Sequence, residues 1–162
     1  MTTTKANLTD FEQKLVDKAV EAMERAYCKY SNFKVGAALV CEDGEIIIGA
    51  NHENASYGAT ICAERSAVVT ALTKGHRKFK LIAIATELEA PCSPCGICRQ
   101  FLIEFGDYKV ILGSSTSDQI IETTTYGLLP FAFTPKSLDD HEKETEERNH
   151  HHSEEQKGKT GH

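Results

Sequence analysis

The sequence predicts an α/β fold, a three-layer α/β/α sandwich with one mixed five-stranded sheet. Three observations predict this class. Helix-like and strand-like segments follow one another along the 162 residues in the order α-β-β-α-β-α-β-β. Residues 79–86 form an almost continuous apolar run, which is typical of a strand covered on both faces. Only residues 113–118 separate the last two strands, and so short a connection predicts an antiparallel pair.

The first helix is expected over about residues 10–27. Thr9 and Glu12 have the capping-box pattern, a hydroxyl at the N-cap and a carboxylate three residues later. The apolar side chains that follow recur at helical spacing: Phe11, Leu15, Ala19, Met23 and Ala26. We expect this apolar stripe to pack on a sheet.

Apolar runs and turn residues predict the remaining elements. The expected strands are 35–41, 45–50, 79–86, 108–112 and 119–124. The turn 42–44 ends in glycine, which tolerates the positive φ of a tight hairpin, so the first two strands should pair. Two further helices are expected, one over 61–72 that ends near Gly75 and one over 95–105 that Gly106 stops.

The chain divides into a domain of residues 1–136 and a tail of residues 137–162. The tail holds 8 acidic and 4 basic residues, and Leu138 is its only sizeable apolar residue. Such a segment cannot bury enough apolar surface to offset its ordering entropy, so we expect it to be disordered. Five of the seven histidines lie there: His141, His150, His151, His152 and His162. They are typical of weak metal binding or of a solvated tail.

Charge and hydropathy exclude several classes of protein. The net charge of −6 argues against an extended nucleic-acid surface, and the one basic cluster, residues 74–80, is short. No apolar run approaches the roughly 18 to 20 residues that span a bilayer. The first ten residues lack the apolar core of a secretory signal. We therefore expect a cytoplasmic protein in a reducing compartment, with no nucleic-acid or membrane partner.

The six cysteines are expected to serve a metal or a catalytic site rather than disulfides. Cys95 and Cys98 stand three residues apart at the predicted start of a helix, which puts both sulfurs on one face. A redox dithiol, half of a structural zinc site and two packed thiols are alternative interpretations of this pair. Only two histidines lie in the body of the chain, so a metal there needs mainly cysteine or carboxylate ligands.

Cys62 opens the other helix that flanks the same predicted strand. Three thiolates would leave one coordination position of zinc open, as in a catalytic site, whereas a fourth ligand such as Cys92 would close it. Glu64 stands two residues after Cys62, within a short reach of a metal-bound water. Taken alone, Glu64 is a surface residue in the first turn of a helix; together with the cysteines it matches the signature of zinc-dependent nucleobase deaminases.

With these residues in place, the chain resembles a cytidine deaminase of the small homotetrameric type. The resemblance covers roughly residues 8–136 and rests on five segments in family order: 26–39 (AYCKYSNFKVGAAL), 51–57 (NHENASY), 62–67 (CAERSA), 93–100 (SPCGICRQ) and 128–130 (LLP). It implies a cytidine deaminase-like fold, a homotetramer and one Zn²⁺ per chain. Lys29 stands where the family often has proline, and His52 and Cys92 stand where apolar residues are usual.

The resemblance also implies roles for individual residues. Cys62, Cys95 and Cys98 would hold zinc, and Glu64 would be the proton shuttle. Residues implied to bind the substrate are Asn51 and Glu53 at the ribose hydroxyls, the backbone N–H of Ala63 at the pyrimidine 2-oxygen, Phe33 near the base, Asn54 and Tyr57. Residues implied to line a neighbouring subunit's pocket or the pocket mouth are Tyr57, Phe133 and Tyr30. By base rates alone, Phe33 and Phe133 would be core residues.

The implied reaction is the hydrolytic deamination of cytidine and deoxycytidine to uridine and deoxyuridine in pyrimidine salvage. A zinc-bound hydroxide would add to C4, and ammonia would leave. Three thiolates make zinc a weak Lewis acid, and Arg65 and Arg99 are the cations available to offset their charge. Our hypothesis is that Arg65 hydrogen-bonds a ligand sulfur; the alternative is a surface arginine.

The sequence leaves three other functions open. The chain could be a zinc deaminase of another aminopyrimidine nucleoside or nucleotide. It could be an interaction module built on a four-cysteine structural zinc. It could also be a redox protein that uses Cys95 and Cys98.

Overall fold

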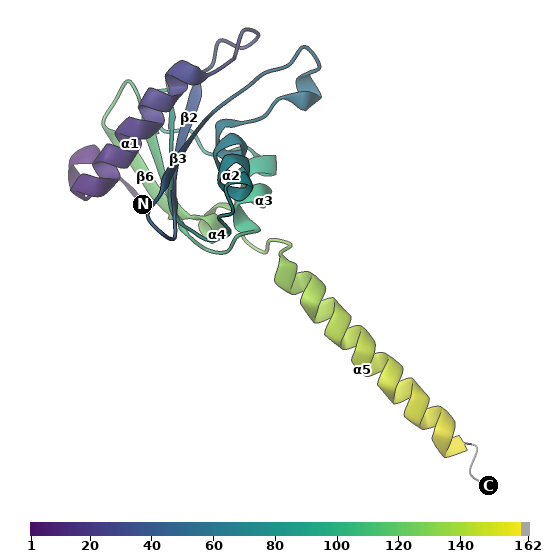
Figure 1. Cartoon of the computed structure of the whole chain (residues 1–162). Helices are drawn as coiled ribbons and strands as arrows, with labels where there is room; N and C mark the ends of the chain where they lie inside the picture. Colours follow the sequence, from purple (N-terminus) through teal and green to yellow (C-terminus); the bar gives the residue numbers. More distant parts are fainter. Residues whose placement is uncertain (160–162) are drawn as a thin grey trace. The chain divides into compact units, whose positions relative to one another are not determined.

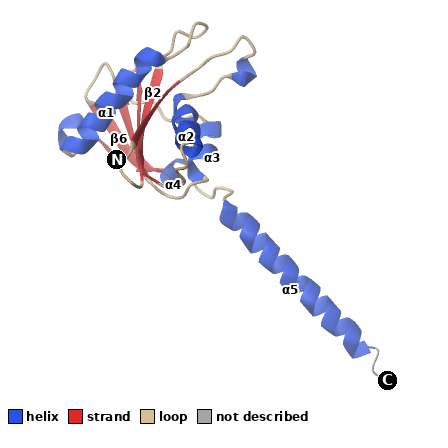
Figure 2. Ribbon diagram, viewed as in Figure 1, coloured by secondary structure: helices blue, strands red, loops and turns tan. Residues whose placement is uncertain are grey.

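The computed structural model describes residues 1–159, with side chains described through His151. It has two compact units, residues 1–130 and 131–162, and each is described by itself. The expectation of disorder includes residues 160–162, and these residues, among them His162, lie outside the described part of the chain. The side chain of His152 lies outside it as well. The first unit contains all of the strands among the described residues, and Figures 1 and 2 show its helices on both sides of them.

Six strands form one mixed sheet in the order β1-β6-β5-β4-β2-β3. Their bounds are β1 Thr2–Thr4, β2 Val35–Cys41, β3 Ile46–Ala50, β4 Phe79–Thr86, β5 Lys109–Ser114 and β6 Gln119–Thr124. Strand β4 is parallel to β5, and every other pairing is antiparallel. The predicted hairpin and the predicted antiparallel end pair are both confirmed, and Gly44 has a φ of 92° in the hairpin turn.

The sheet has one strand more than the five that the sequence predicts. The extra strand, β1, places Thr2 opposite Ile121 at the outer edge of β6. Three consecutive threonines have no apolar alternation, so the local sequence carries no signal for this strand. Its formation depends on the edge that β6 offers, which is a tertiary effect.

Helices cover both faces of the sheet and complete the predicted three-layer sandwich. Helix α1, Asp10–Ala22, lies on one face, and helices α2, Ala63–Thr73, and α3, Gly96–Ile103, lie on the other (Figure 1). Each face has its own core. Leu15, Val16 and Ala19 of α1 pack with one set of strand side chains, while Ala67, Val68 and Leu102 pack with the other set.

The remaining helices of the first unit are short. They comprise the 3-10 helices η1 Lys5–Asn7, η2 Met23–Arg25 and η3 Tyr57–Ala59, and the four-residue helix α4 Thr125–Leu128. Gly75 and Gly106, which follow α2 and α3, both have a φ of 97°, as expected of glycines that stop helices.

Helix α1 begins as predicted and ends earlier. Both capping-box bonds are present: the Glu12 N–H donates to Thr9 Oγ1 at 3.2 Å, and the Thr9 N–H donates to Glu12 Oε2 at 3.1 Å. Phe11, which the sequence assigned to the apolar stripe, is 48% exposed. A stripe of residues spaced by four drifts about 40° per step around a helix with 3.6 residues per turn, so Phe11 and Met23 cannot both face the sheet. The buried face uses Leu15, Val16, Ala19 and Ala22 and continues to Met23, so the burial predicted for Leu15, Ala19 and Met23 is confirmed.

A glycine in β3 brings α2 unusually close to the sheet. A Cβ atom at Gly49 would lie 2.4 Å from the Ala63 carbonyl oxygen and 2.5 Å from the Ala67 nitrogen. Because both of those atoms belong to the backbone of the helix, only glycine permits this approach. The contact sets the distance of the first turn of α2 from the sheet, and this turn carries Glu64, two residues after Cys62.

The second unit contains a helix where the sequence predicts a tail without regular structure. Helix α5 spans Pro135–Lys159. Residues 136–157 contain neither proline nor glycine and are rich in glutamate, which favours helix. Lys136 and Asp140 form an ion pair one turn apart, at 2.7 Å. Leu138 is 58% exposed, so the helix has no buried apolar face of its own at this residue. The first unit ends at Pro130, six residues before the expected boundary at residue 136.

Candidate zinc-binding active site

Three cysteines from two helix starts come together beside strand β4. Cys62 is the N-cap of α2, Cys95 is the N-cap of α3, and Cys98 lies in the first turn of α3. Their three sulfur atoms lie within 4.8 Å of one another, and the sulfurs of Cys62 and Cys95 are 4.0 Å apart. The positive ends of two helices therefore face the cluster and favour the thiolate forms.

This sulfur cluster fits a zinc ion. Tetrahedral zinc with Zn–S bonds of about 2.3 Å separates its sulfur ligands by about 3.8 Å. The Cys62–Cys95 sulfur separation of 4.0 Å is close to this value, and all three sulfurs lie within 4.8 Å of one another. Zinc is also one of the metals that thiolate ligands favour.

Cys92 is not a member of the cluster. Its thiol donates to the Ser93 carbonyl at 3.7 Å, and the group of sulfurs within ligating distance consists of Cys62, Cys95 and Cys98 among the side chains that the structure describes. All six thiols are free. The arrangement therefore favours three protein ligands and one open position over a closed four-cysteine site.

Glu64 is a buried carboxylate at the edge of this cluster. The residue is 4% exposed, and its Oε2 accepts a hydrogen bond from the Cys98 thiol at 3.7 Å. Burial raises the pKa of Glu64 to about 7, and the Cys62 thiolate pushes it in the same direction. A carboxyl with a pKa near neutrality can both accept and donate a proton, which is the property that a proton shuttle requires.

The thiols share charge unequally in the absence of a metal. Hydrogen-bonding contacts with Cys98, Arg65 and Cys95 lower the pKa of the Cys62 thiol to about 5 despite its burial. The hydrogen bond to Cys62, burial and the nearby Glu64 raise the pKa of Cys98. One thiolate is thus already favoured at neutral pH, and a cation at the cluster would favour the others.

Arg65 and Arg99, the two cations that the sequence offers, have different surroundings. Arg65 Nη2 donates to Cys62 Sγ at 3.8 Å and to the Thr60 carbonyl at 3.2 Å. Arg99 instead donates to the carbonyls of Pro94 and Leu128, at 2.8 and 2.9 Å, and to Ser93. Arg65 is therefore the arginine that contacts a sulfur of the cluster.

A cavity of about 300 Å³ opens next to the thiols and Glu64. It brings together many of the residues that the sequence singled out: Phe33, Asn51, Glu53, Cys62, Glu64 and Cys95. Ser31, Val35, Thr60, Ile84, Thr86, Cys92 and Ser93 complete its lining. Sequence reasoning did not single out Ser31, Thr60 or Thr86, because nothing in the local pattern distinguishes them from ordinary polar residues.

Asn51 and Glu53 hold the loop that precedes β2. The Asn51 side chain donates to the Phe33 carbonyl at 2.8 Å and accepts from the Val35 N–H at 2.9 Å. Glu53 Oε2 accepts from the backbone N–H groups of Tyr30 and Ser31 at 2.8 and 3.1 Å. Both side chains therefore line the cavity and fix its wall.

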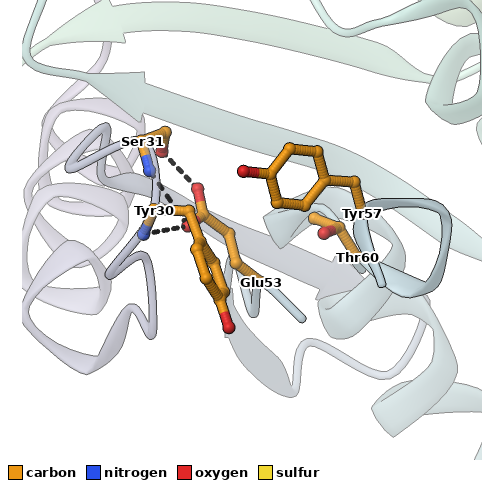
Figure 3. Close-up of a pocket in the computed structure, with 5 residues that line it drawn as sticks. All are labelled: Tyr30, Ser31, Glu53, Tyr57 and Thr60. Carbon is orange, nitrogen blue, oxygen red and sulfur yellow. Dashed lines mark hydrogen bonds between the residues drawn. The ribbon is translucent and has the colours of Figure 1, made fainter. Parts of the chain in front are cut away.

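A second, outer pocket of about 240 Å³ adjoins the first through shared residues. Tyr30, Ser31, Glu53, Tyr57 and Thr60 line it, and Figure 3 shows Glu53 bonded to the Tyr30 and Ser31 side of the pocket. The Tyr30 and Tyr57 rings have centroids 5.6 Å apart. Tyr57 is 73% exposed, so the outer pocket is open to solvent on its side.

Three other predicted residues are not among the described lining residues of these cavities. Asn54 is exposed, accepts from the Ser56 N–H at 2.8 Å, and is not among the described lining residues. Ala63 is fully buried as the first residue of α2, and its position in the chain puts its N–H between Cys62 and Glu64. Phe133 is 60% exposed and belongs to the second unit.

Comparison with known proteins gives a consistent set of relatives. Residues 9–114 match the family described as the cytidine and deoxycytidylate deaminase zinc-binding region. The chain is 48% identical over 130 residues to a cytidine deaminase of Halalkalibacterium halodurans, covering 79% of this chain and 98% of the relative. It is 47% identical over 128 residues to a cytidine deaminase of Sporosarcina psychrophila, covering 78% and 93%.

Solved structures give the same result. The chain superposes on a cytidine deaminase from Burkholderia pseudomallei with a TM-score of 0.72 and 46% identity, covering 78% of this chain and all of the other. It superposes on a cytidine deaminase from Mycobacterium tuberculosis with a TM-score of 0.64 and 33% identity, covering 78% and 98%.

Within the described residues, no helix combines the length and the apolar character needed to cross a membrane.

Proposed function

The chain belongs to the family of cytidine and deoxycytidylate deaminases that share this zinc-binding region, and from this premise we propose that it hydrolyses the amino group of cytidine, giving uridine and ammonia. It is a zinc-dependent hydrolase with a mixed α/β sheet flanked by helices. We extend the proposal to deoxycytidine, because the two substrates carry the same reacting base.

One observation carries this function. A buried carboxylate, Glu64, lies 3.7 Å from the Cys98 sulfur in a cluster of three thiols that has an adjoining cavity. A structural zinc site would need neither an open fourth position nor a buried carboxylate beside it. A redox dithiol would need only two of the three sulfurs.

Cys62, Cys95 and Cys98 would hold the zinc ion. When bound, zinc supplies a Lewis acid that lowers the pKa of a water molecule at its open position. Arg65, with its guanidinium on Cys62 Sγ, would offset part of the negative charge of the three thiolates. We propose that this contact keeps the site electrophilic enough for the reaction.

Glu64 would move the protons of the reaction. Its carboxylate would accept a proton from the attacking water and transfer it to the ring nitrogen N3 of the pyrimidine. The same carboxyl would then help to protonate the departing amine, which leaves as ammonia. The raised pKa of Glu64 supports this double role, since one group must act first as a base and then as an acid.

The cavity walls would bind the nucleoside. Asn51 and Glu53 would hydrogen-bond the ribose hydroxyls, and Phe33 would lie near the base; all three line the cavity with Glu64. The backbone N–H of Ala63 would meet the pyrimidine 2-oxygen. We keep Asn54 and Tyr57 as weaker proposals, because Asn54 lines neither cavity and Tyr57 lines only the outer pocket.

The direct test is uridine formation from cytidine by the purified protein. We expect turnover, about one zinc per chain, and loss of activity in a chelator that zinc restores. Cys95→Ser should lose both metal and activity, while Cys92→Ser should keep both. Stoichiometric zinc without ammonia release, together with zinc loss in Cys92→Ser, would instead indicate a four-cysteine structural site.

We also propose a homotetramer in which Tyr30, Tyr57 and Phe133 help to line pockets near subunit boundaries. An exposed apolar surface on α3 supports association: Ile97 is 65% exposed and lies with Phe101 and Phe105 along a hollow of about 570 Å³. Light scattering on the purified protein tests it, and a monomer at micromolar concentration would contradict it.

A reducing, cytoplasmic location and a place in pyrimidine salvage complete the proposal. The free thiols support the location, because the zinc site needs all three of its sulfurs reduced. The proposed product, a free uridine nucleoside, supports the role in salvage. Measurement of uridine pools in cells that depend on this protein for cytidine use tests that role.

A further inference from the structure

The hydroxyl of Ser31 has two partners of opposite kind. The Phe33 N–H donates to Ser31 Oγ at 3.1 Å, which uses a lone pair of that oxygen. Ser31 Oγ also lies within hydrogen-bonding distance of Glu53 Oε1. An ionised carboxylate has no proton to donate, so the hydroxyl proton of Ser31 must be donated to Glu53.

The rest of the Glu53 side chain is held by the same loop. The backbone N–H groups of Tyr30 and Ser31 donate to Oε2, the other carboxylate oxygen, as Figure 3 shows. The backbone N–H of Glu53 donates to the Tyr27 carbonyl at 2.7 Å. Within the described part of the chain, no basic side chain forms an ion pair with Glu53. Its orientation therefore depends on neutral donors, and Ser31 supplies the side-chain donor.

Ser31 and Glu53 also lie where a nucleoside would meet the protein. Both line the cavity that contains Glu64 and Cys62, and both line the outer pocket. A carboxylate offers about four lone-pair directions. The loop uses three of them, which leaves one for a ligand hydroxyl.

We propose that Ser31 is a positioning residue for ribose recognition, because its hydroxyl fixes the Glu53 carboxylate in the orientation that accepts a hydrogen bond from a ribose hydroxyl. This inference rests on the proposed function, in which Glu53 binds the ribose. It adds a specific requirement: without the Ser31 hydroxyl, Oε1 loses its side-chain donor and the carboxylate can rotate about its last bond.

The test compares Ser31→Ala with the wild-type holoenzyme on cytidine and on 2′,3′-dideoxycytidine, which lacks the 2′ and 3′ hydroxyls and keeps the 5′ hydroxyl. With cytidine we expect KM to rise about tenfold and kcat to change by less than about twofold, as for a lost hydrogen bond to a charged group. With dideoxycytidine we expect kcat/KM to change by less than about twofold. The ratio of the two kcat/KM values does not depend on the fraction of folded protein, so a poorly folding variant still gives an answer.

Three further variants make the outcome specific. Ser31→Thr keeps the hydroxyl and should retain wild-type discrimination. Ser56→Ala removes an exposed hydroxyl from the loop that contains Glu53, and it should leave kcat/KM for both substrates unchanged. Glu53→Gln should lower kcat/KM for cytidine more than kcat/KM for dideoxycytidine. The difference measures the full contribution of the carboxylate.

The results distinguish the positioning role from the proposed function. If the wild-type protein forms no uridine from cytidine, the proposed function fails. Suppose that cytidine is a substrate and that Glu53→Gln loses more kcat/KM on cytidine than on dideoxycytidine. If Ser31→Ala shows no such difference between the two substrates, the positioning role alone is overturned. The positioning role is also overturned if Ser31→Ala loses kcat/KM equally on both substrates. It is overturned as well if Glu53→Gln loses no more kcat/KM on cytidine than on dideoxycytidine.

Discussion

Glu64 combines two properties in one carboxyl, nearly complete burial and direct contact with a sulfur of the proposed zinc site. A glutamine at this position would keep the size of the side chain and lose its ability to exchange a proton. We expect Glu64→Gln to retain about one zinc per chain and to lose about 10³-fold or more in kcat. Metal analysis and steady-state kinetics on the same preparation test this. Undiminished turnover would exclude Glu64 as the proton shuttle.

Arg65 makes a different kind of contribution at the residue scale. Its guanidinium contacts a sulfur and a carbonyl, and its buried Nε has no hydrogen-bond partner among the described residues. A side chain held at that cost is expected to matter for the charge of the site. We predict that Arg65→Ala weakens zinc retention or turnover at least about tenfold.

A charge-matched control separates this effect from a change in net charge. Lys14 is exposed on α1, so Lys14→Ala removes one positive charge away from the thiols. Competition with a chelator, followed by measurement of bound zinc, compares the two variants. If Arg65→Ala and Lys14→Ala retain zinc equally well, Arg65 acts only as a surface arginine and does not tune the charge of the site.

At the scale of the element, the start of α1 carries a pH dependence. Burial raises the pKa of Glu12, but hydrogen bonds from Lys109 and from the backbone of Thr9 outweigh it and lower the pKa overall. A lowered carboxyl pKa gives stability that is present above the unfolded-state value of about 4.3 and is lost as the pH falls through the folded-state value.

Glu12→Gln can keep the capping-box bond but loses the ion pair with Lys109 and the negative charge at the start of α1, so it should lower the free energy of unfolding by about 1 kcal/mol at pH 7. The difference from wild type should shrink as the pH falls below about 4, because the wild-type carboxyl is then protonated as well. Urea unfolding across this pH range measures it, with Glu21→Gln on the exposed face of α1 as the control. A difference independent of pH would contradict an ionic role.

Elements with strong local signals could be predicted from the sequence. The bounds of β2 and β4 agree with the expected ones, because both strands are continuous apolar runs between turn residues. Strand β1 could not be predicted, since three threonines form a strand only at the free edge of β6. Helix α5 was missed because the expectation of disorder weighed lost apolar burial and not the high helix propensity of glutamate-rich sequence.

The candidate site was predictable to a similar extent. The spacing of the thiols and the resemblance to a family were enough to group the three cysteines with Glu64. The bonds of Asn51 to Phe33 and Val35 could not be foreseen, because they join residues 16 and 18 positions apart through the tertiary fold. The same reason hid Ser31, whose importance depends on where Glu53 lies.

At the scale of the whole molecule, catalysis and the C-terminal helix belong to different units. The thiols, Glu64 and the cavity all lie within residues 1–130. We expect a chain that ends at Lys136 to keep wild-type kcat/KM for cytidine within about twofold and its melting temperature within a few degrees. Its circular dichroism should lose helical signal. A large loss of activity would show that α5 contributes to the working enzyme.

The two helix starts that supply the sulfurs are separated along the chain by the whole of β4. A zinc ion bound by both would cross-link Cys62 to Cys95, two residues that are 33 positions apart in the chain. Opening of either helix at its first turn would break that cross-link, so metal release and local unfolding should occur as one event. The rate at which zinc exchanges would then report how often the backbone around the active site opens, even in a molecule that remains folded everywhere else.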